Sequence, residues 1–461
     1  MTTPSPRAAI TTLGCKLNQY ESEQIREQLA RLGYDIVAFE DVADVYVVNS
    51  CTVTGRSDRD CRRLARKAKR QNPEATVVMA GCYAEVSPEE LREIPEIDLV
   101  LGNEDKVRLH ELLPQAAALG AVGLLGSVGL PTPACDLPHY SAGAMVTEFA
   151  RHTRAFVKVQ EGCDAACTYC VIPKARGASR SVPLDDVLEQ CRRLAAAGHP
   201  EVVLIGTHLG RYGQDLPDTP DLAGLCRRLC AEPSVRRLRL SSIEPREITP
   251  ELIALAAASG RALTSAGGRA LSGEGKLCRH LHIPLQSGCD TVLRRMARPY
   301  DTGFYADLIR AIHAAEPSIC IGADVMVGFP GETDDEFEQT RALLAGLPLA
   351  YLHVFTYSRR PGTPAAEMPD EVGYETKIAR NHILRDLSQA KRATFAQENV
   401  GRELEVVVET GSAATPAGHR TGVSDNYLQV QFPGDENLVG ELVTVAITAS
   451  AEGGVWGELV G

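Results

Sequence analysis

The sequence predicts an α/β protein in three parts: an N-terminal parallel-sheet domain, an incomplete (β/α)6 barrel of TIM type, and a small C-terminal β-barrel. Apolar, β-branched runs alternate with helical patterns over most of the chain, which is typical of parallel strands buried on both faces. The residues from about 396 onward form short alternating segments between turn residues instead. A chain of 461 residues is also too long for one ordinary hydrophobic core.

The first domain is expected to span residues 8–113. Strand-like runs occur at 8–13, 45–49 and 75–80, and helical patterns at 21–33 and 56–70. This alternation predicts a flavodoxin-like fold, in which helices cover both faces of an open parallel sheet. Residues 114–150 are rich in Gly, Ala and Pro, and we expect them to be a linker.

A second βα series predicts the barrel between residues 151 and 390. Its candidate strands are 155–159, 202–205, 237–240, 280–284, 322–327 and 351–355, each followed by a helical pattern. Six such units are fewer than the eight that close a TIM barrel, so the barrel should be incomplete. Residues 257–276 interrupt the series with Ala, Gly and Ser, and we expect a flexible surface insertion there.

The C-terminal part, residues 396–461, shows the third pattern. Its candidate strands are 404–408, 428–432 and 442–447, with Gly and Asn/Asp turns between them. The pattern fits a small β-barrel of the TRAM type, an OB-like module associated with RNA binding.

The most informative motif is Cys163-x3-Cys167-x2-Cys170. Three thiolates in one short loop can hold three corners of an iron–sulfur cube, whose usual complement is four cysteines. A structural zinc site needs four closed ligands, and no fourth Cys or His lies at finger spacing nearby. The motif therefore indicates a cluster with one iron open to an external ligand, and so a site of chemistry rather than of electron transfer alone.

This motif is the signature of the radical S-adenosylmethionine (SAM) enzymes. The longer string from Glu161 to Pro173, followed by Ala175-Arg176-Gly177 and Ser179-Arg180-Ser181, resembles the methylthiotransferase branch of that superfamily. The resemblance implies that the open iron of a 4Fe-4S cluster binds the amino and carboxylate groups of SAM. It also implies reductive cleavage of SAM to a 5′-deoxyadenosyl radical, with Cys163, Cys167 and Cys170 as catalytic ligands.

Three further cysteines lie at the carboxyl ends of predicted N-terminal strands. They occur in Gly14-Cys15-Lys16, Ser50-Cys51-Thr52 and Gly81-Cys82-Tyr83. In an open parallel sheet these ends line the ligand crevice, so three segments direct a thiol to one place. Any one of them could simply be a small buried residue. By resemblance, all three are metal ligands of a second 4Fe-4S cluster, which carries the sulfur to be transferred.

Polar residues and glycines follow the predicted barrel strands, at the ends where TIM-type barrels place their active sites. The resemblance makes the following residues candidate contacts of SAM: Tyr169, Gly206, Thr207, His208, Ser242, Glu244, Gln286, Asp324 and Gly328. An isolated histidine such as His208 is more often structural than functional. Cys226 and Cys230 lie four apart on one helix without a third ligand, so we expect them to pack in a core.

The string Gly14-Cys15-Lys16-Leu17-Asn18-Gln19 is similar to the methylthiotransferases that act on N6-threonylcarbamoyladenosine (t6A). The resemblance implies methylthiolation of C2 of t6A at tRNA position 37, with two SAM molecules, two 4Fe-4S clusters, and external electron and sulfur donors. The alternatives are a methylthiotransferase for isopentenyladenosine in tRNA, one for a ribosomal-protein aspartate, and a non-catalytic Fe–S protein that binds RNA.

Charge gives no support to RNA binding. The formal net charge is −12, and the predicted C-terminal barrel is acidic. Basic residues gather instead in the helical pattern 56–70, which is either a phosphate-facing or a merely solvated surface. Arg176 and Arg180 follow the three-cysteine motif and are expected to meet an anionic substrate. With neither a signal-peptide pattern nor a long apolar run, and with 14 cysteines, we expect a cytoplasmic protein without membrane or DNA partners.

Overall fold

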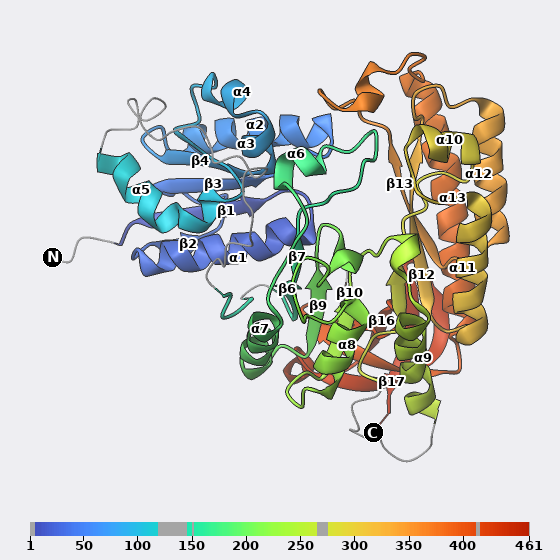
Figure 1. The fold of residues 1–461 in the computed structure, drawn as a ribbon. Helices are drawn as coiled ribbons and strands as arrows, with labels where there is room; N and C mark the ends of the chain where they lie inside the picture. The colour runs from blue at the N-terminus through green and yellow to red at the C-terminus, as the bar shows by residue number, and fades with distance from the viewer. Residues whose placement is uncertain (1–4, 119–144, 150–151, 265–274, 412–414, 461) are drawn as a thin grey trace.

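The computed structural model describes residues 5–118, 145–149, 152–264, 275–411 and 415–460. They form a mixed α/β molecule whose N-terminal sheet domain lies beside a central barrel, with a small β-barrel at one end of the central one (Figure 1). The three-part fold class predicted from the sequence is thus confirmed. No helix in these ranges is both long and apolar enough to cross a membrane.

The N-terminal domain is a parallel sheet with strand order β2-β1-β3-β4-β5, the order of flavodoxin-like folds. Its strands are β1 Arg7–Thr12, β2 Asp35–Val37, β3 Val45–Ser50, β4 Thr76–Gly81 and β5 Leu99–Leu101. Its helices are α1 Lys16–Arg31, α2 Gly55–Gln71, α3 Cys82–Val86, α4 Pro88–Arg92 and α5 Leu109–Ala118. Every residue of β3 is buried, because α1 covers one face of the sheet and α2 the other. The predicted linker begins inside α5, and most of it lies outside the described residues.

The central barrel contains six parallel strands at the predicted places. They are β6 Arg154–Lys158, β9 Glu201–Ile205, β10 Arg237–Leu240, β11 His280–His282, β12 Cys320–Val327 and β13 Tyr351–Thr356. They form two three-stranded sheets, of order β10-β9-β6 and β11-β12-β13. Two isolated parallel bridges, Leu238 with Leu277 and Ser242 with His282, connect the two sheets. Two short strands, β7 Gln160–Glu161 and β8 Arg180–Ser181, pair beside β6. The prediction of an incomplete (β/α)6 barrel is confirmed.

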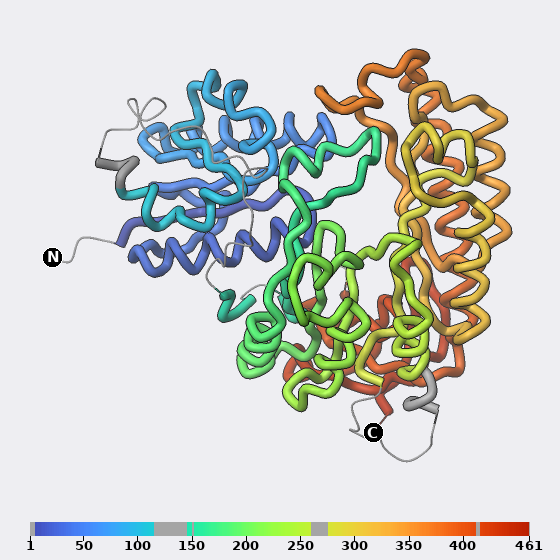
Figure 2. Tube along the Cα trace, viewed as in Figure 1, coloured from blue at the N-terminus to red at the C-terminus, as the bar shows by residue number. Residues whose placement is uncertain are grey.

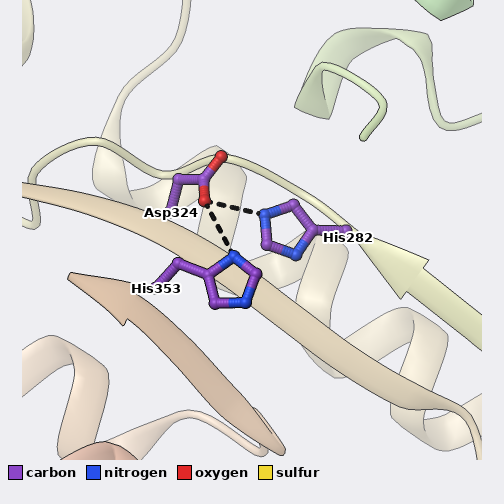
Figure 3. Close-up of side chains that lie close together, drawn as sticks. All are labelled: His282, Asp324 and His353. Carbon is purple, nitrogen blue, oxygen red and sulfur yellow. Dashed lines mark ion pairs between the residues drawn. The ribbon is translucent and has the colours of Figure 1, made fainter. Parts of the chain in front are cut away.

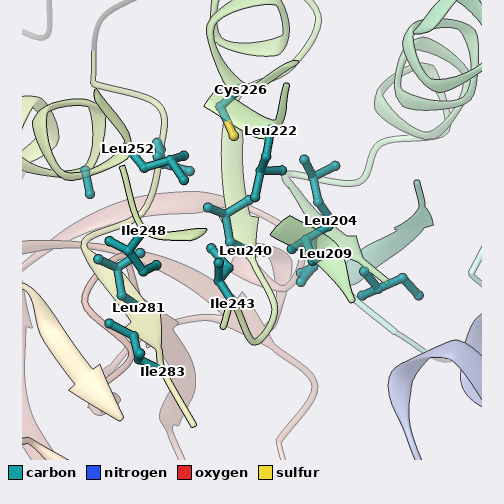
Figure 4. Packing of buried hydrophobic residues seen from close by; sticks show 14 of the residues in the cluster. Leu204, Leu209, Leu222, Cys226, Leu240, Ile243, Ile248, Leu252, Leu281 and Ile283 are labelled. Atoms are coloured by element: carbon teal, nitrogen blue, oxygen red, sulfur yellow. The ribbon is translucent and has the colours of Figure 1, made fainter. Parts of the chain in front are cut away.

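Helices cover the outer face of this barrel. They are α7 Leu184–Ala196, α8 Leu222–Ala231, α9 Pro250–Thr264, α10 Asp290–Arg295, α11 Thr302–Ala315, α12 Asp334–Gly346 and α13 Tyr374–Glu398, with α6 Ile172–Arg176 near the N-terminal domain. Leu240 and Ile283 pack with Leu222 and Leu252 of α8 and α9, and Cys226 lies in the same core, as expected (Figure 4). Side chains alternate along a strand, so Arg239, which precedes Leu240, faces the barrel interior. His282, which precedes Ile283, does the same.

The sequence prediction was wrong for the first part of the 257–276 segment. Residues 257–264 continue α9, whose Ser259 is buried and donates a hydrogen bond to the carbonyl of Leu277. At the other end, Lys276 Nζ donates to the carbonyl of Glu232 at 2.7 Å. An Ala-rich segment has good helix propensity and can bury small side chains, although it carries no apolar stripe. Residues 265–274 lie outside the described ranges.

The C-terminal part is a closed five-stranded barrel with strand order β14-β15-β16-β18-β17. Its strands are β14 Glu403–Glu409, β15 His419–Ser424, β16 Gln429–Pro433, β17 Leu442–Ala451 and β18 Gly454–Leu459. The sequence prediction missed β15 and β18, whose glycines break the apolar alternation. Gly422 of β15 packs directly against the backbone of β14, where a side chain would collide with the carbonyl of Val407.

The small barrel covers the interior of the central barrel at the N-terminal ends of its strands. Arg237 donates to the carbonyls of Glu405 and Val423 at 3.0 and 2.8 Å, while Arg279 pairs with Asp425 at 2.6 Å. Bonds of this kind to buried carbonyls fix the orientation of the small barrel, because any displacement would leave charged groups unpaired.

Candidate active site

The motif cysteines lie in the loop between β7 and α6. The green backbone of this part of the chain lies between the blue N-terminal domain and the yellow and orange helices of the barrel (Figure 2). Cys163 Sγ is 3.3 Å from His208 Nδ1, and Cys167 Sγ is 3.2 Å from Arg298 Nη1. The backbone N–H of Ala165 also donates to Cys163 Sγ at 3.4 Å. All three thiols are partly accessible. Burial is the main cause that raises the pKa of the Cys170 thiol to about 12, and a metal ion binds the deprotonated form of such a thiol.

His208 and Arg298 are held by carboxylates. Burial alone would lower the pKa of His208, but its contacts with Cys163 and Glu247 outweigh burial and raise the pKa to about 10. His208 Nε2 lies 2.7 Å from Glu247 Oε1. Arg298 pairs with Glu244 on its other side. Both side chains therefore present a fixed positive charge to the cysteine loop.

The second trio lies where adjacent strands of the N-terminal sheet end. Cys15 follows β1 at the start of α1, Cys51 follows β3, and Cys82 follows β4 as the first residue of α3. Burial, with smaller contributions from the neighbouring thiols of Cys82 and Cys15, raises the pKa of Cys51 to about 11. The three predicted thiols thus lie close enough to influence one another.

Gly14 allows this approach of the first two loops. Its φ is +102°, and a Cβ on it would lie 2.7 Å from Cys51 Cβ and 2.9 Å from Cys51 Sγ. Asn18 Nδ2 then ties the loops together by donating to the carbonyls of Leu13 and Ser50 at 2.7 and 2.8 Å. Any side chain at Gly14 would displace Cys51, and the backbone conformation itself favours glycine.

Buried polar contacts connect the two trios across the boundary between domains. Asn103 Nδ2 lies 3.7 Å from Cys82 Sγ and donates to the carbonyl of Ala175, in α6 after the motif loop, at 2.5 Å. Arg176 in the same helix bonds Glu21 Oε1 at 2.8 Å and Glu161 Oε1 at 2.6 Å. The trios therefore share one rigid polar framework.

The expectation that Arg176 and Arg180 meet an anionic substrate was wrong. Arg176 is 1% exposed, and Arg180, at 3%, lies 3.2 Å from Glu104 Oε1. Their charges are already compensated inside the protein.

The residues expected to contact SAM lie in one region at the carboxyl ends of the barrel strands. Tyr169 packs edge-on against Phe329, next to Gly328, whose φ is +72°. Gly206 packs closely against Gln160: a Cβ on it would lie 2.9 Å from Gln160 Oε1. The same oxygen accepts a hydrogen bond from the backbone N–H of His208 at 2.7 Å.

Several polar atoms in this region are buried and have no hydrogen-bond partner among the described residues, Thr207 Oγ1 and Gln286 Oε1 among them. Gln286 also has a φ of +69°, which is unusual for a residue with a side chain. Ser242, which lies at the start of the same region, forms an isolated parallel β-bridge with His282. Buried polar groups without partners are rare in folded proteins, so this region is suited to a polar ligand.

Asp324 belongs to a group that the sequence analysis found only in part. Its Oδ1 lies 2.9 Å from His282 Nε2 and 3.5 Å from His353 Nδ1 (Figure 3). Burial alone would raise the pKa of Asp324, but the two histidines hold it well below its usual range. The ligand atoms lie within 4.8 Å of one another, close enough to hold a cation. Because both imidazoles pair with the Asp324 carboxylate, the three side chains also satisfy one another without a cation.

Sequence analysis missed Arg298, Glu247, Asn103, His282 and His353. Arg298 and Asn103 lie in loops, and Glu247 is the last residue of the short 3-10 helix Pro245–Glu247. His282 and His353 lie on predicted strands, and a polar residue in an otherwise apolar strand was the available signal.

A basic cleft of about 820 Å³ begins at Thr54, three residues after Cys51 of the second trio. The start of α2, the end of β13 and α13 line it, with the charged side chains Arg56, Arg59, Lys377, Arg385 and Glu371. Tyr374, at its edge, is 77% exposed. The cleft is positive in an acidic protein, and only the beginning of the basic 56–70 helix contributes to it.

Comparison with known proteins assigns the chain to a family. Residues 7–102 match the model described as "Uncharacterized protein family UPF0004", and residues 157–344 match the Radical SAM superfamily. The threonylcarbamoyladenosine tRNA methylthiotransferase MtaB of Bacillus subtilis is 38% identical over 95% of this chain and 93% of its own length. The MtaB of Aquifex aeolicus is 36% identical over 96% of this chain and 100% of its own.

The chain belongs to the radical SAM methylthiotransferase family. A tRNA-2-methylthio-N(6)-dimethylallyladenosine synthase of Methylobacillus flagellatus is similar too, with 33% identity over 98% of this chain and 99% of its own. Among solved structures, the radical SAM methyltransferase TsrM of Kitasatospora setae superposes with a TM-score of 0.56. It covers 79% of this chain and 77% of its own at 17% identity, a likeness of fold alone.

Proposed function

We propose that the protein is a methylthiotransferase that modifies C2 of N6-threonylcarbamoyladenosine at tRNA position 37. The observation that supports this proposal is the contact, through Asn103, between Cys82 of the N-terminal trio and the helix that follows the three-cysteine motif. It occurs in a chain 38% and 36% identical to relatives named for this activity. The 33% identity to the dimethylallyladenosine synthase keeps that substrate as the second candidate.

The residues fit two three-coordinate 4Fe-4S clusters, with Cys163, Cys167 and Cys170 as one ligand set and the N-terminal trio as the other. Thiolate donors suit iron–sulfur clusters, and the side chains of His208 and Arg298 contact two thiols of the first set. The unpartnered Thr207 and Gln286 atoms suit the polar groups of SAM. When bound, the cluster of the first set supplies the electron that cleaves SAM.

The protein's own residues then hold the reacting groups in one enclosed region. Arg298 and His208 fix the motif loop, while the contacts of Arg176 and Asn103 keep the N-terminal trio at a constant distance from it. Holding two reactants in a fixed relative position removes much of the entropic cost of their encounter. We assign one SAM to methylation of sulfur at the N-terminal trio, and a second to activation of the adenine C2–H bond.

We also propose that the tRNA backbone lies along the basic cleft. Phosphates dominate nucleic-acid affinity, and the cleft carries four cationic side chains against one carboxylate, Glu371. The exposed Tyr374 could stack on an unpaired base. A tRNA substrate implies a cytoplasmic enzyme, and reduction and sulfur supply require external donors.

The test is nucleoside mass spectrometry of total tRNA from a deletion strain complemented with the gene. We expect 2-methylthio-t6A to vanish in the deletion and return with the wild type, but not with Cys163→Ala. Cys230→Ala is the matched control, because this thiol lies in the core of α8 away from both trios. Loss and return of the dimethylallyl nucleoside instead would favour the second candidate, and no change in either would exclude both.

A further inference from the structure

Arg298 places a buried charge directly beside the three-cysteine motif. Its side chain is 3% exposed, and Nη1 donates to Cys167 Sγ at 3.2 Å. The motif loop also rests on the backbone just before Arg298. The N–H of Thr168 donates to the carbonyl of Met296 at 3.1 Å, and Thr168 Oγ1 donates to the carbonyl of Arg295 at 2.9 Å. The guanidinium is therefore fixed at the cysteine loop by several contacts and not by the thiol alone.

Other groups hold the rest of the guanidinium. Nη2 pairs with the Glu244 carboxylate, and Nε donates to Tyr300 OH at 2.9 Å. Tyr300 OH donates in turn to the carbonyl of Pro284 at 3.0 Å, in the segment after β11. A guanidinium has donors only and stays charged. With its other nitrogens engaged, Arg298 therefore directs Nη1 at Cys167 as a permanent donor.

The charges around Arg298 make its effect on the thiol local. Its main ionisable neighbours are Glu244, Tyr300, Tyr169 and Cys167. Only Glu244 among them is a carboxylate, and it forms a neutral pair with Arg298. The field of a neutral pair falls off steeply with distance, so its influence on sulfur depends on the N–H that points to Cys167. The contact itself, and not the net charge of the region, therefore acts on the motif.

The contact at Cys167 bears on the reduction potential of a cluster held by the motif cysteines (the motif cluster). Hydrogen bonds to the ligand sulfurs help to set that potential in iron–sulfur proteins. Reduction adds one negative charge to the cluster and its thiolates. A donor that points at a ligand sulfur favours this added charge, because charge-assisted hydrogen bonds are the stronger ones. Arg298 can only donate, whereas the ring nitrogen of His208 beside Cys163 donates or accepts according to its tautomer.

We propose that Arg298 is a positioning residue that raises the reduction potential of the motif cluster through its hydrogen bond to Cys167. The inference rests on the proposed function, because it concerns the 4Fe-4S cluster assigned there to the motif cysteines. The external donor supplies one electron, and the N–H of Arg298 stabilises the negative charge that this electron brings to the thiolates. Glu244 and Tyr300 serve the same end by keeping Nη1 directed at sulfur.

The test is an anaerobic redox titration of the reconstituted protein, followed by electron paramagnetic resonance. The variant with Cys15, Cys51 and Cys82 changed to Ala identifies the signal of the motif cluster, and the second cluster serves as an internal reference. In Arg298→Met, the ratio of reduced to oxidised motif cluster at a given potential should fall about tenfold. For a one-electron couple this is a shift of about 59 mV to more negative potential. The potential of the second cluster should not change.

Two further variants separate the hydrogen bond from charge and packing. Arg298→Lys keeps a buried cation but lacks the planar fork that holds three partners at once, so the potential should shift in the same direction by a smaller amount. Arg295→Met removes an arginine of the same segment, whose guanidinium is engaged by Glu336 at 2.8 and 2.9 Å. It should leave the potential of the motif cluster at the wild-type value.

A purely structural role for Arg298 would give different results. The motif would then lose iron in both Arg298 variants, or the cluster that remains would keep the wild-type potential, and either result would overturn the inference. An equal shift in Arg295→Met would overturn it too, since any nearby charge would then suffice. If Arg298→Met does not fold, Arg298→Lys decides alone: an unchanged potential overturns the inference, and a negative shift supports it. A wild type that binds no cluster at the motif would instead refute the proposed function, an outcome distinct from these.

Discussion

Arg176 Nη1 lies 2.8 Å from Glu21 Oε1, with both side chains buried at the boundary between the N-terminal domain and the barrel. Glu21 also pairs with Lys106 Nζ at 2.5 Å, so one carboxylate holds two cations from different segments. Burial alone would raise the pKa of Glu21, but Arg176 and Lys106 hold it well below its usual range. This contact fixes the position of one cysteine trio relative to the other.

Arg176→Met should therefore destabilise the protein by about 3–5 kcal/mol, because it removes the buried cation that pairs with both Glu21 and Glu161 and leaves Lys106 to compensate Glu21. It should also reduce methylthio transfer more than SAM cleavage, since the trios lose their fixed spacing. Urea unfolding and the ratio of 5′-deoxyadenosine to product measure the two effects. Arg193→Met removes an exposed pair with Glu189 and should cost less than about 1 kcal/mol. Equal costs for both variants would contradict this role of Arg176.

Glu201 gives a pH-dependent prediction. Burial alone would raise its pKa, but Arg237 and Arg239 outweigh burial and hold the pKa well below its usual range. For a carboxylate with a depressed pKa, the stabilisation is complete above the unfolded-state value of about 4.3 and is lost as pH falls below it. Glu201→Gln should be less stable than wild type at pH 7, with a gap that narrows from pH 5 to pH 3 in urea titrations. A gap that widens toward low pH would refute it.

Charge reversal in the basic cleft should weaken tRNA binding. Arg59→Glu and Arg385→Glu should each raise KM for tRNA several-fold and reduce the salt dependence of binding by about one phosphate contact. SAM cleavage without tRNA should not change. Arg310→Glu alters an equally exposed arginine of α11 outside the cleft and serves as the control. If Arg59→Glu and Arg385→Glu bind tRNA as well as the control and the wild type do, the RNA backbone lies elsewhere.

Gly14→Ala should remove the second cluster selectively. Its Cβ would displace Cys51 in a backbone conformation that disfavours alanine, so about half of the iron should be lost while SAM cleavage persists. Gly33→Ala is the matched control, because its φ is +86° but nothing lies within 4 Å of the added Cβ. Full iron content in Gly14→Ala would show that the Cys51 loop can move without loss of the site.

The sequence predicted the three-part fold and both cysteine trios, because strand runs and cysteine spacing are local features. Its errors involve long-range contacts. Arg176 follows the motif in sequence, yet its partner Glu21 is 155 positions away, so its burial could not be foreseen. In the same way, β15 and β18 are defined by close backbone approach at glycines rather than by alternation. The bonds from Arg237 to the small barrel likewise join segments more than 160 positions apart.

The central claim is that radical formation and sulfur delivery belong to different cysteine trios. A variant with Cys15, Cys51 and Cys82 all changed to Ala tests it most directly, by measuring 5′-deoxyadenosine and methylthiolated tRNA in the same anaerobic reaction. The account predicts that the folded variant still forms 5′-deoxyadenosine but makes no 2-methylthio-t6A. Full methylthio transfer by this variant would contradict it.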